Sequence, residues 1–167
     1  MDATVSNMSV DSKQDCIVCA MIEAAKRAPE DEQGFMLWSA QNRAKEVLPT
    51  YILLYKFHTR RGEFEAALHA AQLGLAEAGR QAGLPTEIAE EACGLLIPEH
   101  VSFEENGAAR FWLFMLKALV SASTQLGKTE NARRYRDVLE CCDPDFSNVG
   151  TLPLDPATTP STEVRCR

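Results

Sequence analysis

Residues 113–146 read LFMLKALVSASTQLGKTENARRYRDVLECCDPDF and contain two helical segments separated by one glycine. The first segment repeats leucine at helical spacing, at Leu113, Leu116 and Leu119. Gly127 interrupts that pattern, and Pro144 cannot continue a helix. Between them, small or apolar residues share one helical face, at Ala132, Tyr135, Val138 and Leu139. We therefore expect an antiparallel pair of helices here.

This unit resembles the 34-residue tetratricopeptide repeat. Large residues stand at the fourth and seventh places of that pattern, at Leu116 and Leu119, and glycine stands at the turn. Ala132 falls where the two helices cross most closely, and a methyl group there allows the helix axes to approach. The resemblance implies an all-α fold of antiparallel hairpins stacked in a short right-handed array.

A second copy of the pattern lies 65 residues upstream. Its first helix carries Tyr51, Leu54 and Tyr55, its turn contains Gly62, and Ala67 stands at the crossing. No proline follows at the place of Pro144, so this second helix is expected to run on towards Gly83. Any αα-hairpin would also give an antiparallel pair, but the shared step of glycine, four residues and alanine favours a repeat.

The remaining chain divides by composition into two tails and further helices. Residues 1–12 are polar and aperiodic and predict a disordered tail, and residues 147–167 predict a second tail rich in proline and threonine. The helical domain is expected over residues 13–146. It begins with helices over 13–26 and 32–47, the second ended by Pro49, and includes a short helix over 84–96.

Two groups of side chains are assigned to the helix interior. In the first helix we expect an inward face of Ile17, Met21, Ala24 and Ala25. In the later repeat, consecutive large aromatic residues must cover several faces of one helix, so core packing is favoured for Phe111, Trp112 and Phe114.

Length and charge exclude several classes of protein. The chain has 167 residues with 46% hydrophobic residues, which is enough for one domain with a sizeable core. Its formal net charge of -7 argues against nucleic acid or an anionic membrane as the main partner. No apolar run approaches the roughly 18 residues of a membrane span, and no signal peptide is recognisable. We expect a cytoplasmic protein whose cysteines are mostly reduced.

Motifs for catalysis or cofactor binding are missing from the sequence. There is no glycine-rich phosphate loop, no HExxH and no Gly-x-Ser-x-Gly, so neither an enzyme nor a cofactor is expected. Cys16 and Cys19 have the spacing of half a metal site and are weak candidates for metal ligands. The alternative is that both pack as small hydrophobes on one face of a helix.

Three phrases carry a narrower resemblance: LYKFHTRRGEFEAALHAAQLGLAEAGRQAGLP, RFWLFMLKALV and LGKTENARRYRDVLECCDPDFSNVG. They are similar to small tetratricopeptide proteins encoded among nitrogen-fixation genes. The likeness covers about half of the chain, between Leu54 and Gly150. It implies a nitrogenase accessory factor, acting in assembly or protection, that binds an assembly or enzyme component.

A binding wall for a partner protein follows from the repeat pattern. Its groove is lined by fixed places on the first helix of each hairpin, and these places hold Lys56, Arg60, Phe114, Lys117, Ser121, Thr124 and Gln125. Cations and hydrogen-bonding groups predict a protein partner with an acidic surface. We therefore expect a non-enzymatic adaptor. The alternatives are a cysteine-based metal or redox carrier and a secretion-type chaperone.

Overall fold

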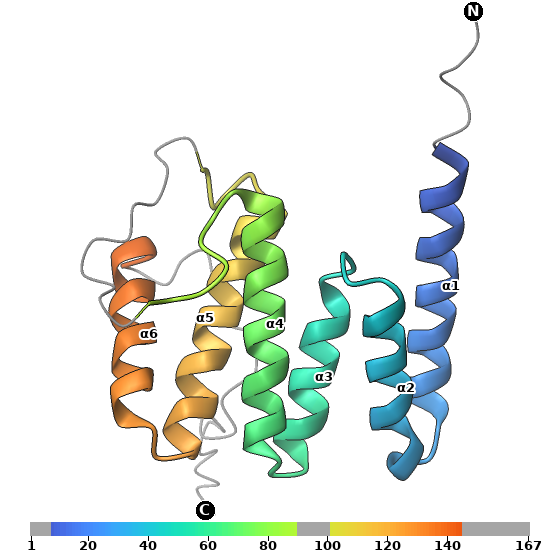
Figure 1. The fold of residues 1–167 in the computed structure, drawn as a ribbon, viewed down its shortest axis with the longest axis horizontal. Coiled ribbons are helices and arrows are strands. Elements are labelled where there is room, and N and C mark those ends of the chain that lie inside the picture. The colour runs from blue at the N-terminus through green and yellow to red at the C-terminus, as the bar shows by residue number, and fades with distance from the viewer. Residues whose placement is uncertain (1–7, 90–100, 145–167) are drawn as a thin grey trace, which may run out of the picture.

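The computed structural model describes residues 8–89 and 101–144, with the side chains of the first helix described from Ile17 onwards. These residues form an all-α fold without strands. The six helices are α1 (Met8–Arg27), α2 (Glu30–Arg43), α3 (Pro49–Arg60), α4 (Phe64–Ala82), α5 (Gly107–Gln125) and α6 (Thr129–Cys142). Figure 1 shows them side by side in a row that follows their order in the chain.

The predicted turns and helix ends of the hairpins are confirmed. Gly62 lies between α3 and α4 with φ 71°, and Gly127 lies between α5 and α6 with φ 69°. This left-handed conformation is strained for other residues, so glycine allows each chain reversal. Gly83 has φ 69° and caps α4, where the sequence predicts that this helix ends. The last helix stops at Cys142, two residues before Pro144.

The main core lies between α3, α4, α5 and α6. Tyr51 and Tyr55 of α3 and a run on α5 from Trp112 to Leu116 are almost fully buried in it. Ala67 is 0% exposed and Ala132 is 5% exposed, as the predicted helix crossings require. Two smaller clusters hold α1 and α2 against α3. The three aromatic residues predicted for the core belong to it, because Trp112 and Phe114 are buried and Phe111 is partly buried against them.

Each helix packs mainly on its neighbours in sequence, which fits a stack of antiparallel hairpins. Gly74 of α4 shows how closely three of them meet. A Cβ atom at this position would lie 2.8 Å from the sulfur of Met115 and 2.9 Å from the Cβ atom of Tyr51. Helices α3 and α5 therefore approach the same point on α4.

The first helix differs from its prediction in length and register. It begins at Met8 rather than near Lys13, because extending an existing helix costs far less than starting one and needs no apolar pattern. Its buried residues are Val18, Ile22 and Ala25, whereas Ile17 is 45% exposed and Ala24 is exposed. The predicted inward face is therefore wrong at Ile17 and Ala24 and right at Ala25, and Met21 is partly buried. Contact with α2 and α3 selects a face centred one residue further along.

Two other boundaries also differ from their predictions. The second helix ends at Arg43 rather than near Val47, and Pro49 begins α3 instead of closing α2. Proline is well tolerated in the first turn because that turn leaves its N–H groups unbonded. Residues 84–89 are not helical, although a helix is predicted to start there. The rest of that predicted helix, the tail over 147–167 and residues 1–7 lie outside the described residues.

Candidate protein-binding surfaces

Helices α3 and α5 contain no aspartate or glutamate, whereas each of the other four helices contains at least two. The lysines and arginines of the two acid-free helices are Lys56, Arg60, Arg110 and Lys117. Among the described residues, none of these four forms an ion pair. Elsewhere, Lys26, Arg61, Arg80, Lys128 and Arg133 are each paired with a glutamate. Other cations of the described residues also form no ion pair, and they are Arg27, Lys45, Arg134 and Arg136, but all except Lys45 lie on helices that contain carboxylates. We call the four unpaired cations of α3 and α5 the cationic face.

The residues predicted for the binding wall divide between these two helices. Lys56 and Arg60 lie one turn apart on α3, with Lys56 partly buried and Arg60 exposed. The members on α5 are partly buried or exposed, and they are Lys117, Ser121, Thr124 and Gln125. Helices α3 and α5 both pack on α4 and meet it near Gly74, so the two groups lie on helices that share this neighbour. Their role in binding stays a prediction.

Phe114 has a different place from the other predicted wall residues. It is 3% exposed and belongs to the main core cluster, with its ring centroid 6.1 Å from that of Phe111. A side chain buried to this extent packs the helix against its neighbours and does not line an open wall. The core assignment of Phe114 therefore holds, and its assignment to the groove does not.

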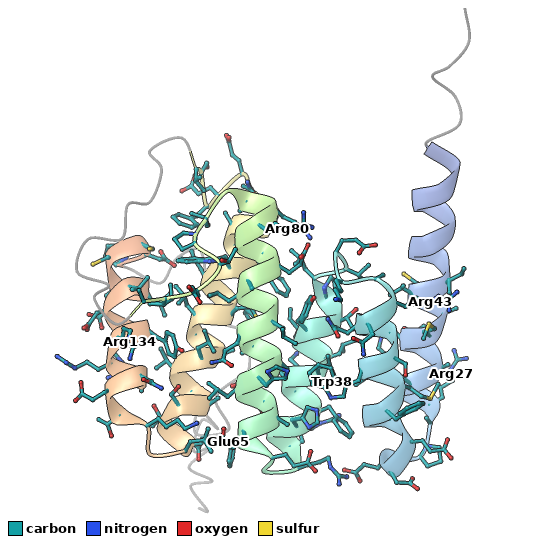
Figure 2. The ribbon with its side chains drawn as sticks, in the orientation of Figure 1. Arg27, Trp38, Arg43, Glu65, Arg80 and Arg134 are labelled. Carbon is teal, nitrogen blue, oxygen red and sulfur yellow. The ribbon has the colours of Figure 1, made fainter. Side chains whose placement is uncertain are left out.

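A second surface is a groove of about 540 Å³ between α2 and α4, with Tyr51 of α3 contributing to its lining. Its sides are formed by Trp38, Gln41 and Asn42 of α2, by Lys45 in the turn that follows α2, and by His69, Leu73, Ala76, Glu77 and Arg80 of α4. Thr86 completes the lining. Figure 2 shows Trp38 between these helices and Arg80 near the C-terminal end of α4. We call this the α2–α4 groove.

Hydrogen bonds fix the Tyr51 side of the groove. The hydroxyl of Tyr51 donates to the carbonyl oxygen of Lys45 at 2.8 Å and accepts from the Gln41 side-chain amide at 3.2 Å. Burial raises the pKa of the Tyr51 hydroxyl above its ordinary value of 10.0, so this group stays a neutral donor. The same bond to Lys45 satisfies a carbonyl just beyond the end of α2. The floor of the groove is thus held in place without needing a ligand.

Trp38 is fixed at one end of the groove by two histidines. Its indole N–H donates to Nε2 of His58 at 3.0 Å, and Nδ1 of His58 lies 2.7 Å from a carboxylate oxygen of Glu63. Because an indole N–H can only donate, Nε2 accepts and the proton is on Nδ1, facing the carboxylate. The Trp38 ring also stacks on His69, with centroids 5.8 Å apart. His58 is buried, whereas His69 is exposed.

Glu63 completes this arrangement from the turn between α3 and α4. It accepts from Arg61 at 2.8 Å as well as from His58. The hydrogen bond from Arg61 and then the one from His58 hold the pKa of Glu63 below its usual 4.5. A carboxylate that stays ionised keeps the imidazole of His58 oriented towards it, and this orientation presents Nε2 to Trp38.

The charges along the groove are unevenly compensated. Arg80 forms a bidentate pair with Glu77, whose oxygens also accept from the Gln81 side-chain amide at 2.7 Å. Lys45 forms no ion pair among the described residues. The lining therefore carries two cations against one carboxylate.

The cysteines do not gather into a metal site within the described part of the chain. Groups of three or more histidine, cysteine, aspartate or glutamate side chains that could hold a metal ion are absent from the described residues. Cys19 is exposed, because Val18 and Ile22 occupy the buried face of α1, so the predicted packing role of Cys19 is wrong. The side chain of Cys16 lies outside the described residues. Burial, and then the neighbouring Cys141, raises the pKa of the Cys142 thiol to about 11.

The arrangement of Trp38, His58 and His69 was not predicted from the sequence. These residues come from three helices, and no spacing in the chain relates them to one another. Only the burial of α3 on both sides, against α2 and against α4, brings the two histidines to one indole. The available signal in the sequence is weak, because Trp38 follows three other large apolar residues, 35–37, and nothing in the spacing distinguishes it from them.

Comparisons with known proteins add no relative to this description. No family model, no curated protein and no solved structure matches the chain. Within the residues that the structure describes, no helix combines the length and the apolar character needed to cross a membrane.

Proposed function

We propose that this protein is a non-enzymatic adaptor that binds a partner protein with an acidic surface through its cationic face. The observation that carries the proposal is the segregation of charge, since α3 and α5 hold only cations in a chain of net charge -7. The four cations of α3 and α5 form no ion pair among the described residues, and they leave an excess of positive charge on these two helices, both of which pack on α4.

Electrostatics of this kind acts mainly on the encounter between two proteins. Opposite potentials raise the association rate and favour acidic partners over others, and salt screens them within about 8 Å at physiological ionic strength. The rigid core behind the face supports this function. Trp112, Leu113 and Met115 of α5 are fully buried, so the helix that presents Arg110 and Lys117 is firmly held.

Charge reversal tests the proposal. A variant with Lys56, Arg60 and Lys117 all replaced by Glu should lose most of its binding to partners captured by the parent from its native cell extract. Capture is measured by affinity purification and mass spectrometry, followed by binding of the purified partner at low and high salt. Raised salt should weaken the parent complex in the same way, while far-ultraviolet circular dichroism of the variant stays unchanged.

A matched control separates the position of the charges from the net charge. Replacing Lys26, Arg133 and Arg136 by Glu makes the same change in net charge on α1 and α6, where all three side chains are exposed. This control should bind the partner like the parent. Equal binding by the two triple variants would move the site away from α3 and α5.

Association with nitrogenase is a narrower form of the proposal. It is supported by the sequence resemblance to tetratricopeptide proteins encoded among nitrogen-fixation genes and by no structural observation. Purified nitrogenase components and their assembly proteins are therefore the first partners to test by size-exclusion chromatography. Co-elution that disappears in the triple variant would support both parts of the proposal together.

A further inference from the structure

We infer that the α2–α4 groove is a second binding site, distinct from the cationic face, that takes an amphipathic helix of another protein carrying an acidic side chain. The inference rests on the dimensions of the groove, on the aromatic residues at one end and on an unpaired cation at the other. It goes beyond the proposed function, because the cationic face can bind an acidic surface whether or not this groove is occupied.

The dimensions fit a short helix. From His69 to Arg80 the groove follows eleven residues of α4, or about 16 Å at 1.5 Å per residue, which corresponds to three turns of a bound helix. The part of α4 that lines the middle of the groove carries Leu73 and Ala76, whose side chains are apolar. Apolar residues at the centre of a groove let the apolar face of a helix pack against it.

One end of the groove provides an anchoring surface. Trp38 is only partly buried, and its ring is held by the bond to His58 and the stack on His69. Phe35 is not part of the groove lining, but it lies three residues before Trp38 and seven before Asn42, so it shares their face of α2, and it is 78% exposed. A fixed indole beside an exposed phenyl ring suits an apolar anchor, because such contacts bury large areas with little loss of conformational freedom.

The other end of the groove selects for negative charge. Lys45 lies in the turn after α2, beside the C-terminal end of α4, where the Gln81 side-chain amide donates to the carbonyl oxygen of the next residue, Glu46, at 2.9 Å. Lys45 forms no ion pair among the described residues. Arg80 faces the same groove with a side chain that is 64% exposed even though it pairs with Glu77. On a partner helix, an apolar side chain and a carboxylate seven residues apart are separated by about 10 Å, which fits within the roughly 16 Å between the Trp38 end and the Lys45 end of the groove.

The groove can be tested with synthetic peptides and the full-length chain. The probe is a 15-residue alanine-based helical peptide with one phenylalanine and one glutamate seven residues apart. A second peptide carries lysine in place of that glutamate, and a third carries a central proline that breaks the helix. Binding is followed by the indole N–H resonance of Trp38 in nuclear magnetic resonance spectra. The chain has two tryptophans, and a Trp38→Phe variant identifies the resonance.

The acidic helical peptide should shift the Trp38 resonance in a saturable manner, with at least fivefold weaker binding for the lysine peptide and for the proline peptide. Lys45→Glu and Phe35→Ser change exposed side chains, so both variants should fold like the parent and bind the acidic peptide at least fivefold more weakly. The triple variant at Lys56, Arg60 and Lys117 should bind this peptide like the parent, since those residues do not line the groove.

Three results would overturn the inference. An unmoved Trp38 resonance at millimolar peptide means that the groove is not a peptide site. Equal binding of the lysine peptide would show that the groove does not prefer acidic residues. Equal binding of the proline peptide would show that the groove takes an extended segment and not a helix. Because the triple variant is measured in the same series, failure of the groove and failure of the cationic face can be told apart.

Discussion

Gly79 lies near the end of α4, where the chain turns back along that helix. Its carbonyl oxygen accepts from the N–H groups of Gly83 and Leu84, the latter at 2.8 Å. A Cβ atom on Gly79 would collide with the carbonyl oxygen of Pro85 and would lie 2.9 Å from that of Leu84. The Pro85 carbonyl is also the acceptor for the indole N–H of Trp112, at 2.7 Å. Replacement of Gly79 by alanine should therefore displace Pro85 and disturb this bond.

The expected magnitude combines one stabilising effect with two destabilising effects. Alanine favours a helix over glycine by about 1 kcal/mol, so the same change at an unhindered helical site would stabilise the protein. Overpacking against backbone atoms that cannot rotate away costs about 1–3 kcal/mol. Trp112 is 0% exposed, and leaving its buried N–H without an acceptor costs a further 1–3 kcal/mol or so. We expect Gly79→Ala to lower the free energy of unfolding by about 1–5 kcal/mol.

Urea unfolding and thermal melting measure this loss, and about 2–4 °C of melting temperature corresponds to each kcal/mol in a chain of this size. The indole N–H resonance of Trp112 should also move. Gly107→Ala is the matched control, because a Cβ atom there would meet nothing within 4 Å at the start of α5. It should leave stability unchanged or raise it by up to about 1 kcal/mol. A Gly79→Ala protein as stable as the parent, with the Trp112 resonance unmoved, would refute this account of the turn.

Two further predictions concern the helix crossings and the groove. Ala67→Leu and Ala132→Leu should each lower the free energy of unfolding by about 1–3 kcal/mol through overpacking, as measured by thermal melting. The control Ala24→Leu, on the exposed side of α1, should leave the stability unchanged. If both crossing variants melt like the parent, the repeat alignment is wrong. The hydrogen bond from Arg80, together with one from Gln81, holds the pKa of Glu77 below its usual 4.5. Ionised Glu77 therefore stabilises the fold above pH 4.5, and this contribution is lost as the pH falls through the lowered pKa. Glu77→Gln should therefore be less stable than the parent at neutral pH, and the difference in urea midpoint should shrink as the pH falls below 4.5 and through the lowered pKa of Glu77. A constant difference would argue against the ion pair as its source.

The sequence alone predicts the hairpins between α3 and α6 because local chemistry places their ends. Gly62, Gly83 and Gly127 adopt backbone conformations that favour glycine, and they separate segments whose apolar residues recur at helical spacing. The same reasoning was weaker at α1, where several alanines and short apolar residues allow more than one inward face. Packing against α2 and α3 buries the face that contains Val18 and Ile22.

The candidate sites divide in the same way between sequence and tertiary structure. Lys56, Arg60 and Lys117 are predicted from repeat positions, because a regular helix fixes which residues face away from its neighbours. Burial of Phe114 depends on how closely α4 and α5 pack, which periodicity does not specify. The α2–α4 groove depends entirely on tertiary structure. Trp38 lies on α2, His69 on α4 and Lys45 in the turn after α2, and only the packing of α2 and α4 on α3 sets the distances between them.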